Sequence, residues 1–244
     1  MDRCDVDVVI VGAGLSGIGA ACHLEKNKLT KKYLVLESRN HMGGTWDLFR
    51  YPGIRSDSDM HTLGYSFKPW QKQKAIANGS DIAGYIRESA AEYGVEKHIR
   101  YGHTLIGASW ESGLARWRLK ILRTEGEPLI ISCNFIYSCT GYYRYDSGYT
   151  PDFDGLESFS GELIHPQHWP KDLDYTDKRV VVVGSGATAV TIVPAMAKKA
   201  AHVIMLQRSP SYVVSMSTDD SFANGLRKWL PQKLAYTLTR FKNI

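Results

Sequence analysis

A glycine-rich turn between an apolar run and a helical pattern occurs twice in this chain of 244 residues. The first turn, Gly12–Gly17 (GAGLSG), follows the valine-rich run Asp5–Val11 and leads into the helical pattern Leu15–Lys26. A second apolar run, Tyr33–Glu37, completes a strand–helix–strand unit, whose crossover is expected to be right-handed. Short valine-rich runs of this kind are typical of strands that are buried on both faces of a parallel sheet.

The same pattern returns about 170 residues later. It predicts a strand over Arg179–Val183, a glycine turn over Gly184–Ala189 (GSGATA), a helix over Thr188–Lys199 and a strand over His202–Gln207. This spacing indicates a duplicated architecture rather than a short-period repeat. We therefore predict an α/β fold with two Rossmann-like dinucleotide-binding domains of three layers (ββα), the second of them incomplete.

Between the two units, the sequence predicts a loop-like stretch over Ser38–Asp59, then a helix and an antiparallel meander. The helix runs over about Asp81–Tyr93, with Ser80 as its N-cap and Gly94 as its end. The strand-like pieces of the meander are joined by short connections and cover Thr104–Trp110, Trp117–Leu122, Leu129–Ile131 and Phe135–Cys139.

These patterns divide the chain into three predicted parts. Residues 1–141 form the first dinucleotide-binding domain with its β insertion, and residues 142–178, rich in Tyr, Asp, Gly and Pro, form a linker. Residues 179–244 form part of the second domain. This last part ends in a possible amphipathic helix with Phe222 and Trp229, which is broken before Pro231.

Composition and charge argue against several other classes of protein. The formal net charge is +5, but residues 221–244 hold five basic residues and no acid, so the remaining body has 25 of each. A neutral body lacks the broad basic footprint of a nucleic-acid-binding protein. No apolar run reaches the length of a membrane-spanning helix, and Asp2, Asp5 and Asp7 outnumber Arg3 where a secretory signal needs cations. The four cysteines, Cys4, Cys22, Cys133 and Cys139, show no C-x-x-C spacing, so we expect reduced thiols and a cytoplasmic setting.

The first glycine turn has the residues that a bound dinucleotide requires. Gly12 permits the tight turn, Gly14 lets a pyrophosphate approach the backbone, and Gly17 lets the helix pack on the strand. The start of the helix, Leu15–Ser16, presents its N–H groups and the positive end of the helix dipole to the anion. Glu37, 25 residues after Gly12, accepts hydrogen bonds from a ribose 2′-hydroxyl and repels a 2′-phosphate, so the turn predicts an FAD or NAD site. The alternative is a packing turn without a ligand.

The second glycine turn differs at the end of its second strand, where no acid occurs. Arg208 stands 24 residues after Gly184, and a guanidinium suits a 2′-phosphate. This turn therefore predicts an NADP site, against the alternative that Arg208 is a solvated surface residue. The predicted phosphate-binding residues are Gly184, Ser185, Gly186, Ala187 and Thr188.

Two dinucleotide sites imply electron transfer between two cofactors, most simply from NADPH to FAD. A reduced flavin passes electrons to a disulfide, a quinone or dioxygen. The disulfide branch is disfavoured because Cys133 and Cys139 are not closely spaced.

A segment between the two glycine turns carries the most specific signal. Phe159–Pro170 (FSGELIHPQHWP) matches the Baeyer–Villiger fingerprint FxGxxxHxxxW(P/D) at every fixed position. With this segment and the motifs Gly43–Trp46 (GGTW), Arg50–Gly53 (RYPG) and Cys139–Tyr142 (CTGY), the chain resembles class B flavoprotein monooxygenases. The resemblance is closest to type I Baeyer–Villiger monooxygenases of the ethionamide-activating kind.

The resemblance implies roles for further residues. Asp57 lies near the reactive flavin edge, Thr140 and Gly141 mark the passage between the domains, and His165 belongs to a linker that moves with the nicotinamide. Asp57 and His165 are therefore the candidate catalytic residues, although Asp57 is also a plausible loop cap. His165 and His168 have H-x-x-H spacing, but no Cys or carboxylate cluster completes a metal site. The flavin-binding residues are Gly43, Gly44, Thr45 and Trp46, and the residues that bind the 2′-phosphate are Arg208 and Ser209.

The resemblance also implies a reaction. An FAD- and NADPH-dependent monooxygenase of this family inserts one oxygen atom from dioxygen into a ketone through a C4a-(hydro)peroxyflavin, or oxygenates sulfur and nitrogen centres. The expected partners are a small ketone, thioether or thioamide and dioxygen, without nucleic acid or an integral membrane segment. Two alternatives stay open: a dinucleotide-binding fragment without turnover, and an ordinary N- or S-oxygenating flavin monooxygenase. Because family members are much longer, we expect a C-terminally truncated sequence whose basic tail packs against absent residues.

Overall fold

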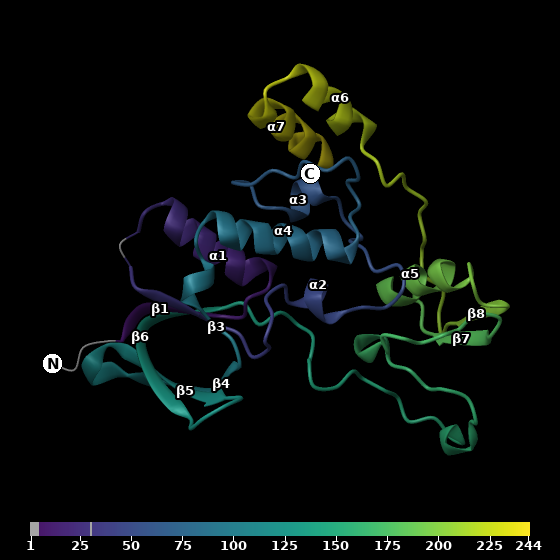
Figure 1. Ribbon diagram of the computed structural model, residues 1–244, viewed down its shortest axis with the longest axis horizontal. Helices are drawn as coiled ribbons and strands as arrows, with labels where there is room; N and C mark the ends of the chain where they lie inside the picture. The colour runs from purple at the N-terminus through teal and green to yellow at the C-terminus, as the bar shows by residue number, and fades with distance from the viewer. Residues whose placement is uncertain (1–4, 30) are drawn as a thin grey trace. The chain divides into compact units, whose positions relative to one another are not determined.

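The computed structural model describes residues 5–29 and 31–244 (Figure 1). Cys4 lies outside the described residues. The chain separates into two compact units. The first unit comprises the described residues up to Leu48 together with Ile82–Tyr143, and the second comprises Phe49–Asp81 together with Arg144–Ile244. The predicted domain boundaries at residues 141 and 178 stay predictions.

The first unit is built on a six-stranded sheet in the order β3-β2-β1-β6-β5-β4. The pairs β1–β2, β1–β6 and β2–β3 are parallel, and the pairs β4–β5 and β5–β6 are antiparallel, as the predicted meander requires. The strands are β1 (Val6–Val11), β2 (Tyr33–Leu36), β3 (Ile99–Arg100), β4 (His103–Glu111), β5 (Arg116–Arg123) and β6 (Leu129–Ser138).

The two faces of the parallel strands are covered by different layers. Val9, Val11 and Leu36 form one core cluster with Leu119 and Ile121 of β5, so the meander folds over this face. Helices α1 (Leu15–Lys26) and α4 (Gly79–Glu92) lie on the opposite side in Figure 1. These are the three layers (ββα) of the predicted α/β fold, and α1 has the predicted bounds.

Some local predictions for this unit were wrong. The two pieces Leu129–Ile131 and Phe135–Cys139 are one continuous strand, β6, because buried Cys133 pairs with Val6 on one side and Trp117 on the other. The loop-like stretch after β2 contains a short helix, α2 (Thr45–Leu48). Ser80 lies inside α4, which begins at Gly79, rather than preceding it as the N-cap.

The second unit contains the second glycine motif and a helical pair. Strands β7 (Arg179–Val183) and β8 (His202–Leu206) pair in parallel, as predicted, and α5 (Ala187–Met196) connects them. The segment before β7 contains the short 3-10 turns Leu156–Ser158 and Pro166–His168. The remaining helices are α3 (Met60–Leu63), α6 (Ser221–Trp229) and α7 (Gln232–Asn243).

The valine run of β7 is typical of a buried strand, but β7 is only partly buried. Val181 and Val183 are more than half exposed, while Ile192 and Met196 of α5 are buried. The alternating burial arises because α5 covers one face of this two-stranded sheet, and the described residues of the second unit leave the other face bare.

The basic tail is helical and partly packed within the second unit, while its large side chains Trp229 and Phe241 are 87% and 85% exposed. It forms α6 and the unpredicted α7, whose inner residues Ala223, Ala235 and Thr239 are buried. Arg227 and Arg240 donate hydrogen bonds to backbone carbonyls of the same unit, at residues 61, 70 and 72. No helix within residues 5–29 and 31–244 is both long and apolar enough to cross a membrane.

Candidate functional site

The turn after β1 is held by close backbone packing. Gly12 has φ +103°, its N–H donates to the Leu36 carbonyl at 2.7 Å, and a Cβ placed on it would lie 2.5 Å from the Cys139 carbonyl oxygen. A Cβ on Gly17 would lie 1.8 Å from the Gly12 carbonyl oxygen. Only glycine satisfies both positions, so the turn and the first residues of α1 are fixed against the strand.

The N-terminus of α1 is a candidate site for an anion. Gly14 is its N-cap residue, and no side chain caps it. By contrast, Asp220 caps α6 by accepting a hydrogen bond from the Ala223 N–H at 3.0 Å. A helix start without a side-chain cap presents backbone N–H groups and the positive end of the helix dipole, which together favour a phosphate. Leu15 and Ser16 occupy this first turn.

Glu37 lies directly after β2 and points at the glycine turn. Its side chain is only 4% exposed; Oε2 accepts from the Ala13 N–H at 2.8 Å and Oε1 accepts from the Arg39 N–H at 2.9 Å. A carboxylate has about four acceptor sites, so capacity for a ribose hydroxyl remains. The structure therefore places the predicted acid beside the predicted phosphate turn.

The Gly43–Trp46 segment lies against the same turn. Gly43 donates from its N–H to the Ala13 carbonyl at 2.9 Å, and a Cβ on Gly14 would lie 3.5 Å from the Gly44 Cα. Thr45 and Trp46 begin α2 and are half-buried.

An ion pair between Arg39 and Asp47 holds this segment in place. Buried Asp47 accepts from Arg39 at 2.8 Å, and Arg39 also donates to the Gly44 carbonyl at 3.4 Å; these contacts hold the segment in place. Sequence reasoning missed this Arg39–Asp47 pair.

Thr140 is exposed where the chain leaves β6, and its N atom would lie 3.6 Å from a Cβ on Gly12.

The second glycine turn is more open. Gly184 has φ +125° and donates to the Leu206 carbonyl at 2.7 Å, which closes the turn on β8. Gly186 is the N-cap residue of α5, and no side chain caps this helix start, Ala187 and Thr188. A Cβ placed on Gly184 or Gly186 would meet no atom within 4 Å.

The residues after β8 return to this turn. Ser185 donates from its hydroxyl to the Ser209 carbonyl at 3.4 Å and accepts from the Ser211 hydroxyl at 3.0 Å. Arg208, the residue directly before Ser209, is exposed. The structure thus brings Ser185 and Ser209 together and leaves the Arg208 guanidinium in solvent, where it can receive an anionic group.

The two predicted catalytic residues occupy different surroundings in the second unit. Asp57 is exposed, and its negative charge contributes to raising the pKa of Tyr51, which burial raises most and a hydrogen bond with Thr188 lowers. His165 is half-buried at the start of a 3-10 turn, where its Nδ1 accepts from the Gln167 N–H at 3.2 Å. Among the described residues, no hydrogen bond or ion pair links Asp57 to His165.

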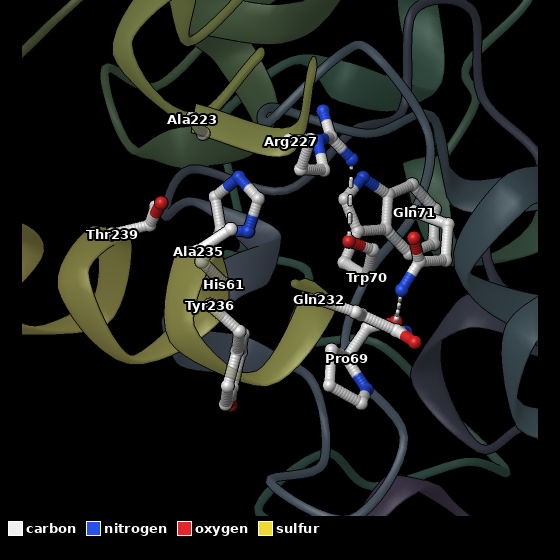
Figure 2. Close-up of a pocket in the computed structure, with 10 residues that line it drawn as sticks. All are labelled: His61, Pro69, Trp70, Gln71, Ala223, Arg227, Gln232, Ala235, Tyr236 and Thr239. Atoms are coloured by element: carbon white, nitrogen blue, oxygen red, sulfur yellow. Dashed lines mark hydrogen bonds between the residues drawn. The ribbon is translucent and has the colours of Figure 1, made fainter. Parts of the chain in front are cut away.

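A small pocket of the second unit lies between the loop at residues 69–71 and helices α6 and α7 (Figure 2). His61 lines it, is 3% exposed, and has an Nε2 atom without a hydrogen-bond partner in the described part of the chain. Burial, reinforced by the positive charges of Arg227 and Lys242, lowers the pKa of His61, against an opposing contribution from acidic neighbours. His61 is therefore uncharged at neutral pH. Residues 5–29 and 31–244 contain no group of His, Cys, Asp and Glu that could hold a metal ion.

Comparison with known proteins identifies the family. The model of the family described as flavin-binding monooxygenase-like matches residues 5–238. The chain is 55% identical over 240 residues to the FAD-containing monooxygenase EthA of Mycobacterium tuberculosis, covering 98% of this chain and 49% of that protein. It is 50% identical over 240 residues to the probable FAD-binding monooxygenase AlmA of Acinetobacter baylyi, covering 98% and 48%.

Solved structures agree with these relatives. An oxidized steroid monooxygenase bound to NADP matches with a TM-score of 0.80 and 29% identity, over 96% of this chain and 43% of that one. OTEMO in complex with FAD and NADP matches with a TM-score of 0.73 and 31% identity, over 86% and 40%. The chain thus spans about half the length of the curated relatives it matches. On the match over residues 5–238, the chain belongs to the flavin-binding monooxygenase-like family.

Proposed function

We propose that the whole protein is an FAD- and NADPH-dependent monooxygenase, with FAD at the first glycine turn and NADP at the second. The observation that carries this proposal is the pair of uncapped helix starts, one beside the buried Glu37 carboxylate and the other beside the exposed Arg208 guanidinium. An acid accepts ribose hydroxyls, whereas a guanidinium binds a 2′-phosphate. The bound relatives named above, with FAD and NADP, support the same pairing.

The first site fits a flavin dinucleotide on the geometry of its own residues. The start of α1 has no side-chain cap, so its N–H groups and the positive end of its dipole favour a pyrophosphate, and Glu37 retains acceptor capacity toward a ribose. Gly43 and Gly44 approach the turn closely enough to extend the surface along the ligand, with Thr45 and Trp46 following. Thr140 adds a hydroxyl at the carboxyl edge of the sheet, where α/β proteins bind ligands.

The second site fits an NADP pyrophosphate because space is open above Gly184 and Gly186. Ser185 and Thr188 supply hydroxyl donors beside the N–H groups of α5, and Arg208 with Ser209 binds the 2′-phosphate. Nicotinamide supplies hydride and flavin supplies oxygen activation when both cofactors are bound. We assign Asp57 to charge control near the reacting atoms and His165 to the linker that orients the nicotinamide.

The substrate is proposed to be a small ketone, thioether or thioamide. A ketone gives an ester or lactone, and a sulfur or nitrogen centre gives an oxygenated product. The fingerprint Phe159–Pro170 favours the ketone reaction over that of an ordinary N- or S-oxygenating monooxygenase.

The experiment begins with the absorbance spectrum of the purified protein, followed by titration with NADP⁺ and NAD⁺. We expect a bound flavin and a clear preference for NADP⁺. NADPH and dioxygen consumption would then be compared with product formed from a ketone and from a thioether. A flavin-free protein that cannot be reconstituted, or an equal affinity for NADP⁺ and NAD⁺, would contradict the proposal.

A second proposal is that this chain by itself binds dinucleotides without turnover. The bare apolar face of the β7–β8 sheet favours it, because Val183 and Leu206 are 59% and 57% exposed. Nucleotide domains normally bury such a face. Oxygenated product formed by this chain with NADPH and added FAD would refute it.

A further inference from the structure

The backbone of Arg39 is anchored beside Glu37, the acid of the first glycine turn. The Arg39 N–H donates to Glu37 Oε1 at 2.9 Å, and the Arg39 carbonyl oxygen accepts from the Gly102 N–H at 3.2 Å. The other carboxylate oxygen of Glu37 accepts from the Ala13 N–H, within that turn, at 2.8 Å. The Arg39 side chain therefore starts from a backbone position that is fixed relative to both the acid and the turn.

The Arg39 guanidinium reaches the segment Gly43–Asp47, which lies against the same turn. Nη2 donates to Asp47 Oδ2 at 2.8 Å, and Nη1 donates to the Gly44 carbonyl oxygen at 3.4 Å. The side chains of Arg39 and Asp47 are only 23% and 7% exposed, so the ion pair is largely shielded from water. Charge-assisted hydrogen bonds are roughly twice as strong as neutral ones. One side chain thus joins the acid of the turn to the neighbouring segment.

The Gly43–Asp47 segment depends on such contacts for its shape. Gly43 and Gly44 have φ of +122° and +55°, and neither has a side chain that could pack. Helix α2 is four residues long, which is too short to be stable by itself. The hydrogen bond from the Gly43 N–H to the Ala13 carbonyl oxygen, at 2.9 Å, fixes one end of the segment, and Arg39 holds the other end.

A second arginine near Asp47 is a weaker partner. Nη1 of Arg87, on α4, lies 4.0 Å from Asp47 Oδ1, and the Arg87 side chain is 52% exposed. Solvent screens a pair that is this long and this exposed, so its contribution is small. Of these two ion pairs, the one with Arg39 is therefore the stronger for the buried carboxylate.

We infer that Arg39 is a positioning residue for FAD: it holds the Gly43–Asp47 segment at the separation from Glu37 that a complete dinucleotide requires. This inference rests on the proposed FAD site at the first glycine turn. In that site Glu37 accepts from a ribose, and the segment extends the surface along the ligand. Without the guanidinium, the two parts of the site would sample more relative positions, and binding of FAD would have to restrict them.

The test compares Arg39→Lys with the wild-type chain after removal of FAD. Lysine keeps a positive charge beside Asp47 but lacks the planar fork that also reaches Gly44. Flavin fluorescence gives the Kd for FAD, and displacement of FAD gives the inhibition constant of AMP, which contains a ribose but no flavin. We expect the Kd for FAD to rise about 10-fold, as for the loss of one charge-assisted hydrogen bond, and the constant for AMP to change less than about 2-fold.

The comparison with AMP separates positioning from a general loss of structure. AMP needs Glu37 and the start of α1, but it is too short to require the correct separation of both parts of the site. The matched control is Arg116→Lys, which alters another shielded ion pair of the first unit. Nε of Arg116 lies 3.1 Å from Glu111 Oε2, and the two side chains are 13% and 30% exposed. This control should leave both constants unchanged.

The substitution Asp47→Asn tests the same link from its other end. It should reproduce the selective loss of FAD affinity, and adding Arg39→Lys to it should weaken FAD binding no further. If Arg39→Lys does not fold, Asp47→Asn by itself decides through the same comparison of FAD with AMP.

Three results would overturn the inference and leave the proposed function standing. These are an equal loss of affinity for FAD and AMP, an unchanged Kd for FAD, and additive effects of Arg39→Lys and Asp47→Asn. A wild-type chain that does not bind FAD would remove the FAD site and the inference with it.

Discussion

The two glycine turns share a sequence pattern, but the protein packs around them differently. In the first unit, a Cβ on Gly12 or Gly17 would overlap backbone atoms at 2.5 and 1.8 Å. In the second unit, a Cβ on Gly184 or Gly186 would meet nothing within 4 Å. The third position of the motif follows the same division, because the second unit has Ala189 where the first requires Gly17.

The comparison separates two physical reasons for glycine. In the first turn, glycine is required by the protein itself, since strand and helix approach too closely for a side chain. In the second turn, Gly184 is required by its φ of +125°, whereas Gly186 has an ordinary φ of −77° and no neighbour that excludes a Cβ. Space kept open over Gly186 is what a ligand that contacts the backbone would need.

The largest expected effect tests this comparison directly. Gly17→Ala should lower the free energy of unfolding by about 3 kcal/mol or more, because its Cβ cannot coexist with the Gly12 carbonyl oxygen. Its matched counterpart, Gly186→Ala, should change stability by no more than about 1 kcal/mol and weaken NADP⁺ binding about 10-fold. Denaturant unfolding and NADP⁺ titration check the pair. Equal destabilisation by both variants would contradict the distinction.

The next effect concerns the acid of the first turn. In Glu37→Gln, one side-chain oxygen becomes an amide that cannot accept, so either the Ala13 or the Arg39 N–H loses its partner. An unpaired buried donor costs about 1–3 kcal/mol, and FAD occupancy should fall with stability. The flavin content of the purified variant gives the measurement, with the exposed Glu125→Gln as control. Full flavin occupancy and unchanged stability in Glu37→Gln would count against the assignment of Glu37 to the FAD site.

The substitution Arg208→Gln tests the proposed contact of the second turn with a 2′-phosphate. Removing one charge-assisted contact should weaken NADP⁺ binding about 10- to 30-fold and leave NAD⁺ binding nearly unchanged. The ratio of the two dissociation constants is the measurement, and Lys171→Gln, exposed in the same unit, is the control. A parallel loss for both nucleotides would place Arg208 away from the 2′-phosphate.

The smallest expected effect is a pH dependence in the stability of the second unit, which contains His61. The pKa of buried His61 lies below its ordinary value of 6.5 in the folded state, so the unfolded chain binds more protons as the pH falls below 6.5. The second unit should therefore lose stability from about pH 6.5 down to the lowered pKa, by at most about 1.4 kcal/mol per pH unit. Hydrogen exchange of α7 amides, corrected for intrinsic rates, measures the loss. His61→Gln should flatten the profile and the exposed His202→Gln should not; identical profiles for wild type and His61→Gln would disprove the role.

Local elements of the site followed from the sequence with few errors. The bounds of α1 and β7 were predicted correctly because glycine turns and valine runs act over a few residues. The arrangement of these elements in space was harder to predict from the sequence. The polar residues that flank Cys133 made β6 look like two strands, yet its backbone is paired on both sides. The contact of Gly53 with α5 had no local signal beyond its family motif.

The sequence by itself determined which turns have glycine, which strand ends in an acid and which in a guanidinium, because these properties belong to single residues and their neighbours. Only the tertiary structure decided that Gly12 is crowded and Gly186 is not, that Glu37 points at Ala13, and that Gly53 lies against Thr191 and Ala195 of α5. Periodicity reports that a residue prefers burial. It carries no information on which distant segment covers that residue, since the partner is selected by packing of the whole unit.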